Sequence, residues 1–303
     1  MSFVLTLIGG PEARALTPAH AALARDALSG HGERPAPPSW LAPAIACDIP
    51  FDAPPTLGAK ALAEDIAGRF GGDPIDVVIQ PEPHRRKKLF VADMDSTIIE
   101  QECLDELADF VGLKARVANI TRRAMNGELA FEPALRERVG LLKDLDAAVL
   151  TRVYEERITL MPGARALLST MRAHGVVTCL VSGGFSYFVE RVARDAGFEE
   201  VRCNVLLSDR GRLTGAVAEP IFGRKAKRAA LIELRDKLGL DRVDTLALGD
   251  GANDLGMIEE AGLGVAYRAH PVLERAAPAV IRHGDLTAIL YLQGYRDDEI
   301  VAA

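Results

Sequence analysis

The stretch LFVADMDST at residues 89–97 joins four apolar residues to a polar cluster. The apolar half predicts a short buried strand, and the polar half places two carboxylates, Asp93 and Asp95, one residue apart at its end. Two buried carboxylates this close repel each other unless a cation or a shared proton relieves them. The stretch therefore indicates a metal site, a proton-transfer pair, or both. The plainer alternative is an exposed loop whose Asp and Ser residues cap the next helix.

The chain from residue 85 onward alternates between strand and helix patterns. Predicted strands lie at 89–92, 176–181, 204–207 and 243–248, and three of the four end immediately before a polar cluster. This order predicts an α/β fold in which helices cover both faces of a parallel sheet, with ligand sites at the carboxyl ends of the strands. Residues 211–215 predict a turn between two short antiparallel strands.

A long helical stretch, roughly residues 100–173, separates the first two of these strands. It is too long for a simple crossover connection. We therefore expect an inserted helical cap at about residues 100–165 that lies over the site.

Residues 1–84 differ from the rest because prolines crowd their middle and their end. Their patterns predict a β-α-β-α-β module that is compatible with a ferredoxin-like α+β domain, with strands at 1–8, 44–51 and 75–79 and helices at 18–29 and 58–70. We place the boundary between this domain and the second one, 85–303, after residue 84.

Composition narrows the classes of function. The 303 residues carry 36 basic and 43 acidic side chains, a formal net charge of −7, which disfavours a surface built to bind nucleic acid or anionic lipid. The four basic residues at 85–88 are interpreted as a solvated linker. No apolar run approaches the ~18 residues that span a bilayer. Four scattered cysteines without zinc-site spacing, and a first segment without export-signal features, predict a cytoplasmic protein.

Three further polar clusters carry candidate chemistry. Ser182, Gly183 and Gly184 follow a predicted strand, where a hydroxyl and exposed backbone N–H groups suit a phosphate oxygen; a tight turn is the alternative. The run GRKAKR at 223–228 begins an amphipathic helix, and most such runs are solvated surface. The run GDGAND at 249–254 adds acids after another strand, but it lacks the third glycine of a dinucleotide fingerprint.

Together and in this order, the four clusters resemble the motifs of the haloacid dehalogenase (HAD) superfamily of phosphohydrolases. The resemblance narrows to the phosphoserine phosphatase family through DMDST at 93–97, Glu102, FEPALRERV at 131–139, SGGF at 182–185 and GDGANDL at 249–255. It covers about residues 88–275. It implies a HAD-like Rossmannoid sheet with a helical cap, and a soluble enzyme that hydrolyses O-phosphoserine in the last step of serine biosynthesis.

The resemblance also assigns the catalytic and metal-binding residues. Asp93 would be the nucleophile that becomes an aspartyl phosphate, and Asp95 would be the general acid and base. Mg²⁺ would be held by Asp93, Asp250 and the main-chain carbonyl of Asp95.

Substrate contacts follow from the same resemblance. Ser182, Gly183, Lys227 and Asn253 would bind the phosphoryl group, with Lys225 as the competing lysine and Asp254 as a residue that orients the lysine or metal-bound water. Glu102 would bind the ammonium group of phosphoserine and Arg138 its carboxylate, while the apolar residues Met125 and Phe131 would close over the substrate.

Two other functions remain open at this point. The same chemistry on another small phosphomonoester, or phosphoryl transfer to a second alcohol, would use the same residues. A non-catalytic amino-acid-binding regulatory protein is the alternative from a different class. A weak resemblance of residues 1–84 to ACT-like regulatory domains implies a homodimer or serine sensing.

Overall fold

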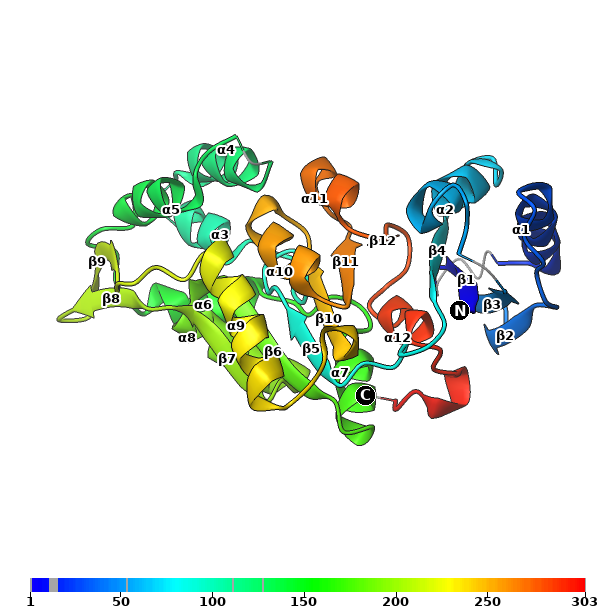
Figure 1. Ribbon diagram of the computed structural model, residues 1–303. Helices are drawn as coiled ribbons and strands as arrows, with labels where there is room; N and C mark the ends of the chain where they lie inside the picture. Colours follow the sequence, from blue (N-terminus) through cyan, green and yellow to red (C-terminus); the bar gives the residue numbers. More distant parts are fainter. Residues whose placement is uncertain (1, 11–15, 53, 111, 127, 303) are drawn as a thin grey trace.

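The computed structural model describes residues 2–10, 16–52, 54–110, 112–126 and 128–302. It contains a six-stranded sheet in the middle of the ribbon in Figure 1 and a separate four-stranded sheet at its right-hand end, with the helix α12 (Ala288–Leu292) between them. A two-stranded sheet completes the strands of the described residues.

The six-stranded sheet has the order β12-β11-β10-β5-β6-β7, and all neighbouring strands are parallel. This confirms the predicted parallel α/β sheet. The strands are β5 (Leu89–Ala92), β6 (Val177–Phe185), β7 (Glu200–Asn204), β10 (Thr245–Gly249), β11 (Leu263–Tyr267) and β12 (Ala279–Ile281). Ala92 pairs with Leu248 on one side and with Leu180 on the other, so the polar clusters that follow these strands share one edge.

Helices cover both faces of this sheet, which explains why all four residues of β5 are fully buried. Leu89 and Val91 pack in the cluster that includes residues of α9 (Arg224–Lys237) and α10 (Leu255–Glu260). Phe90 and Ala92 point to the other face, in the cluster that includes residues of α7 (Ala164–Ala173), α8 (Ser186–Ala196) and α12. The period-2 alternation of the strand thus divides its apolar side chains between two cores.

Two predictions about the strands need correction. The predicted strand at 204–207 is wrong in its bounds, because β7 ends at Asn204 and a different strand, β8 (Leu206–Asp209), begins two residues later. The short strands β11 and β12 were not predicted, since brief apolar runs beside small residues carry little periodicity. The antiparallel pair around residue 211 is confirmed as β8 and β9 (Arg212–Val217).

A helical insertion leaves the sheet between β5 and β6, and most of its helices lie at the upper left of Figure 1, above the strand ends. Its helices are α3 (Cys103–Asp109), α4 (Lys114–Met125), α5 (Phe131–Gly140) and α6 (Val149–Arg157). The two connections to the core are held side by side, because Gln101 exchanges hydrogen bonds of 2.8 and 2.9 Å with Thr159. We call this insertion the cap.

The four-stranded sheet confirms the predicted α+β domain. Its order is β2-β3-β1-β4, all antiparallel, which is the ferredoxin-like arrangement. The elements are β1 (Phe3–Gly9), α1 (Pro18–Gly30), β2 (Ser39–Ala42), β3 (Ala46–Phe51), α2 (Ala59–Gly68) and β4 (Ile75–Pro81). The extended stretch predicted at 44–51 is confirmed as β3. The strand β2, at residues 39–42, was not predicted, because prolines on both sides obscure it in the sequence.

The predicted solvated linker at 85–88 is half wrong. Arg85 is partly buried, with 11% of its side chain exposed, and it pairs with Asp48 at 2.7 Å and donates to the carbonyls of Tyr291 and Leu292. Lys87 is buried, whereas the other two residues of the run are exposed. The second face of the small sheet therefore packs against α12 through buried polar contacts.

The remaining structure consists of short helices, namely α11 (Pro271–Ala276) and the 3₁₀ helices η1 (Arg242–Asp244), η2 (Ala252–Asp254) and η3 (Asp297–Glu299). Among the described residues, none of the helices combines the length and the apolar character that crossing a bilayer requires.

Candidate active site

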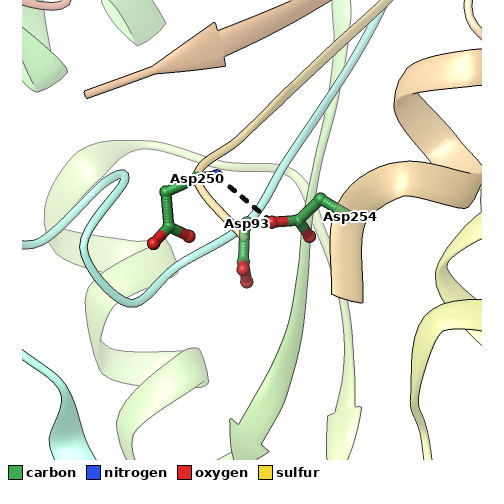
Figure 2. A group of neighbouring side chains, drawn as sticks. All are labelled: Asp93, Asp250 and Asp254. Carbon is green, nitrogen blue, oxygen red and sulfur yellow. Dashed lines mark hydrogen bonds between the residues drawn. The ribbon is translucent and has the colours of Figure 1, made fainter. Parts of the chain in front are cut away.

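Three buried aspartates gather where β5 and β10 end. One carboxylate oxygen from each of Asp93, Asp250 and Asp254 lies within 4.8 Å of the others, and Figure 2 shows the three side chains converging. All three are at most 2% exposed. The Oδ1 atom of Asp250 has no hydrogen-bond partner among the described residues. Burial and the charges of Asp254 and Asp93 raise the pKa of Asp250 well above its ordinary value.

Lys227 supplies the positive charge in this cluster. Its Nζ atom lies 2.7 Å from Oδ1 of Asp93 and 2.8 Å from Oδ1 of Asp254, and the side chain is fully buried. Burial alone would lower the pKa of Lys227, but the two carboxylates outweigh it and hold that pKa above its ordinary value. The structure thus places Lys227 inside the site and leaves Lys225 exposed outside it.

Protein donors occupy both carboxylate oxygens of Asp254. Oδ1 accepts from Lys227, while Oδ2 accepts from the backbone amides of Asp250 and Gly251, each at 3.2 Å. The loop folds closely over this group, because a Cβ atom on Gly249 would lie 2.5 Å from Cγ of Asp254. The contacts of Asp254 suit a residue that orients the lysine and the loop.

Two groups besides Lys227 hold the carboxylate of Asp93. The backbone amide of Met94 donates to Oδ1 at 2.7 Å, and Nδ2 of Asn253 donates to Oδ2 at 3.2 Å. Asp95 turns toward the cap, where Oδ1 accepts from the amide of Cys103 at 3.1 Å. Burial, with the charge of Asp93 as the second cause, raises the pKa of Asp95 to about 6.

The predicted phosphate-binding loop borders the same space. Ser182 is fully buried, and its Oγ accepts from the amide of Gly184 at 2.9 Å. A Cβ atom on Gly184 would lie 3.2 Å from Oδ2 of Asp95, so the glycine lets the loop approach this carboxylate. The structure brings Gly183 and Gly184 to the pocket that contains Asp93 and Asp95, while Ser182 lies directly before them and does not line it.

The cap contributes two oppositely charged side chains to this pocket. Glu102 accepts from Oγ of Ser96 at 2.9 Å, and burial together with the charge of Asp95 raises its pKa well above the ordinary value. Arg138 is 3% exposed, and no described carboxylate lies within 4.0 Å of its guanidinium. Its Nη1 donates instead to Oγ1 of Thr121 at 2.8 Å, and that hydroxyl donates to Asp105 at 2.8 Å.

The pocket itself is a small cavity of about 30 Å³ beneath the cap. That volume is close to the space of one water molecule. The pocket is lined by Asp93, Asp95, Glu102, Cys103, Leu104, Phe131, Leu135, Arg138, Gly183, Gly184, Phe185 and Asn253. The cap therefore covers Asp93 and Asp95 in this structure.

The structure also adds residues that the sequence analysis did not identify. Thr121 and Asp105 hold Arg138, and Ser96 holds Glu102; each contact joins side chains from separate turns, for which the sequence carries no local signal. The side chain of Met125, which was predicted to close over the substrate, is outside what the structure describes.

Comparison with known proteins places this site in a family. A family model described as haloacid dehalogenase-like hydrolase matches residues 90–259. A phosphoserine phosphatase from Polaromonas sp. is 43% identical over 210 residues, which are 68% of this chain and 89% of that protein. The chain belongs to the phosphoserine phosphatases of the haloacid dehalogenase-like hydrolases.

Other relatives of this phosphatase family extend the comparison. A phosphoserine phosphatase from Archaeoglobus fulgidus is 42% identical over 217 residues, 71% of this chain but only 63% of that protein. A solved structure of a phospho-aspartyl intermediate analogue of phosphoserine phosphatase is 38% identical, with a TM-score of 0.65 over 68% of this chain and 98% of that one.

One solved structure also covers the small N-terminal domain. A HAD family hydrolase from Salmonella enterica serovar Typhi has a TM-score of 0.81 at 26% identity, over 98% of this chain and 99% of that one. This likeness agrees with the predicted fold class, a HAD-like sheet preceded by an α+β domain.

Proposed function

We propose that this chain hydrolyses O-phosphoserine to serine and phosphate through an aspartyl phosphate on Asp93, the last step of serine biosynthesis. The observation that carries the proposal is one buried pocket in which Asp93 and Asp95 lie together with Glu102 and Arg138. An unspecific phosphomonoesterase needs only Asp93 and Asp95. Glu102 and Arg138 match the ammonium and carboxylate groups of a phosphorylated amino acid.

A divalent cation fits the buried acids of the site. Asp250 presents an unpartnered carboxylate oxygen beside Asp93, and three buried aspartates facing a single lysine leave negative charge uncompensated. Hard oxygen donors suit Mg²⁺. We propose that Asp93, Asp250 and the main-chain carbonyl of Asp95 hold it. When bound, the ion would reduce the repulsion between the carboxylate of Asp93 and the phosphate dianion.

The residues of the chain divide the reaction into two displacements. In the first, a carboxylate oxygen of Asp93 forms a bond to phosphorus as the bond from phosphorus to the serine oxygen breaks, and Asp95 gives that oxygen its proton. In the second, Asp95 takes a proton from water as the water oxygen attacks phosphorus, which frees Asp93. Lys227 and Asn253 hold the carboxylate of Asp93 in place throughout.

Recognition of the substrate uses the remaining polar groups of the pocket. Ser182, the amide of Gly183 and Lys227 would bind the phosphoryl oxygens, since O–H and N–H donors stabilise the charge that accumulates there. Arg138 has no carboxylate partner in the described part of the chain and would form a two-pronged hydrogen bond with the substrate carboxylate. Glu102 would accept from the substrate ammonium group.

Phosphate release from a panel of phosphomonoesters tests the proposal. With purified full-length protein and Mg²⁺, O-phosphoserine should give the highest kcat/KM, and Asp93→Asn should abolish release. Equal rates for all monoesters would instead support an unspecific phosphatase. An absence of Mg²⁺-dependent release from any of them would support a regulatory binding protein.

The organisation of the whole protein is part of the proposal. We divide the chain into domains 1–84 and 85–303, since the strands of the small sheet all lie within residues 3–81. The four cysteines form no disulfide, in keeping with a cytoplasmic location. A homodimer formed through the ACT-like domain stays a prediction, which sedimentation analysis of the full chain tests.

A further inference from the structure

Asn204 is a buried polar residue at the end of β7 for which the mechanism above has no role. It is 2% exposed, and its side chain uses both ends of its amide. Nδ2 donates to the carbonyl of Gly183 at 2.9 Å and to that of Phe222 at 3.1 Å, while Oδ1 accepts from the backbone amide of Phe222 at 2.6 Å. One side chain thus joins two backbone segments that lie far apart in the sequence.

The first segment is the phosphate-binding loop, at a point where the sheet does not hold it. Val181 pairs with Arg202 and Phe185 pairs with Asn204, so residues 182–184 of β6 bulge against a single residue of β7. Ladder hydrogen bonds are interrupted at such a bulge. The side chain of Asn204 replaces them with a bond to the carbonyl of Gly183.

The second segment leads into the helix that carries the catalytic lysine. Phe222 is followed by Gly223, which is the N-cap of α9, and Lys227 lies in the first turns of that helix. Asn204 therefore fixes the distance between the phosphate-binding loop and the start of α9.

The gap between these two segments is filled by a side chain of the cap. A Cβ atom on Gly183 would lie 2.6 Å from Cζ of Phe131, and one on Gly223 would lie 2.9 Å from Cδ1 of the same ring. Gly223 has φ −126°, which any residue can adopt. Position 223 therefore needs a glycine to leave room for the ring of Phe131, and not because of its backbone conformation.

We propose that Asn204 is a positioning residue that fixes the width of the gap between Gly183 and Gly223. The ring of Phe131 occupies this gap when the cap covers the pocket. The inference rests on the proposed phosphatase function. An amide is required because it presents two N–H donors to carbonyls and one oxygen to an N–H. In the variant Asn204→Asp, a carboxylate oxygen would face each carbonyl, and the two segments would separate.

A double-mutant cycle tests this arrangement. Asn204→Asp and Gly223→Ala should each lower kcat/KM about 10- to 100-fold, because a displacement near 1 Å in a catalytic site has effects of this size. Phe131→Ala removes the ring that the gap receives. If the gap acts through that ring, a double variant that combines Phe131→Ala with either other change should have a kcat/KM no more than about threefold below that of the worse single variant. A double variant whose loss in kcat/KM equals the product of the two single losses would overturn the proposal.

The cycle needs a control for lost stability. Gln293 is another buried amide, 1% exposed, whose Nε2 donates to the carbonyl of Ile289 and whose Oε1 accepts from the amide of Lys87, away from the pocket. Gln293→Glu makes the same chemical change and should lower the melting temperature with kcat/KM within about twofold of the parent. A loss of kcat/KM in Gln293→Glu equal to that in Asn204→Asp would reduce Asn204 to a structural role and overturn the proposal.

The design separates failure of this inference from failure of the proposed function. Each variant is assayed with O-phosphoserine and with p-nitrophenyl phosphate, so the coupling is measured even if the parent prefers another monoester. If Asn204→Asp does not fold, Asn204→Ser takes its place, since it removes both N–H donors without adding charge. Parental activity in a folded Asn204→Ser or Gly223→Ala variant overturns the proposal.

Discussion

The Nζ atom of Lys227 lies 2.7 Å from Oδ1 of Asp93, and both side chains are buried. An ion pair of this kind adds little to stability by itself, yet removal of one partner leaves the other as an unpaired buried charge. The contact has two effects. It holds the carboxylate of Asp93 in position, and it offsets part of the negative charge that Asp93, Asp250 and Asp254 concentrate at the strand ends.

Replacement of Lys227 should damage both activity and stability. Lys227→Met is expected to lower kcat at least 10²-fold, since the phosphoryl group loses its charge partner. Loss of the cation also leaves Asp93 and Asp254 unpaired, which should lower the free energy of unfolding by about 3–5 kcal/mol. Lys225→Met, an exposed change two residues away, is the control and should keep parental values. Equal losses in both variants would refute the assignment of Lys227.

Arg138 should determine the choice of substrate. Arg138→Ala is expected to raise KM for O-phosphoserine about 10²-fold, because a charge-assisted pair with the substrate carboxylate is lost. Hydrolysis of p-nitrophenyl phosphate, which has no such carboxylate, should change less than about threefold. Arg136→Ala, an exposed arginine on the same helix, serves as control. An equal loss on both substrates would show that Arg138 supports the fold of the cap and not its specificity.

Thr121 should act on specificity through Arg138. Thr121→Val keeps the shape of the side chain but removes the hydroxyl that accepts from Arg138 and donates to Asp105. We expect KM for O-phosphoserine to rise about 5- to 20-fold with kcat little changed, since one buried hydrogen bond contributes about 1–2 kcal/mol. Steady-state kinetics of this variant with both substrates measures the effect. A fall in kcat at unchanged KM would contradict it.

Metal binding should appear as a gain in stability. A saturating excess of Mg²⁺, at 100 times its dissociation constant, should raise the free energy of unfolding by about 2.7 kcal/mol and the melting temperature with it. Asp250→Asn should abolish this shift. The same variant should be more stable than the parent without metal, because it removes a buried carboxylate whose pKa lies well above its ordinary value. Thermal melts with EDTA and with Mg²⁺ measure both effects, and a parental shift in Asp250→Asn would exclude this residue as a ligand.

The motifs at strand ends could be predicted because chemistry and position coincide there. Asp93 and Asp250 each follow an apolar strand, Ser182 lies near the carboxyl end of another, and parallel strands bring their carboxyl ends to one edge. Asn204 and Thr121 could not be found in this way. The partners that define their roles lie 16 to 21 residues away, so no local pattern marks them.

Charge runs mislead for a related reason. Residues 85–88 have the composition of a solvated linker, but Arg85 has a buried partner, Asp48, 37 residues earlier in the chain. Burial of a basic side chain depends on where the tertiary fold places its acceptors. Lys87 likewise donates to two backbone carbonyls, those of His84 and Val243.

Lys87 makes stability depend on pH in the alkaline range. Burial lowers the pKa of Lys87 to about 8, although Asp244 opposes this. The unfolded chain keeps a lysine pKa near ~10.4 and binds more protons between these values, so the free energy of unfolding should rise with pH from about 8 to 10.4, by up to ~3 kcal/mol. Lys87→Met should lack this gain, whereas Lys237→Met, at an exposed site, should keep it. Urea unfolding of the three proteins at pH 7 and pH 10 measures the difference. Parallel pH profiles for the parent and Lys87→Met would mean that Lys87 stays charged in the folded protein.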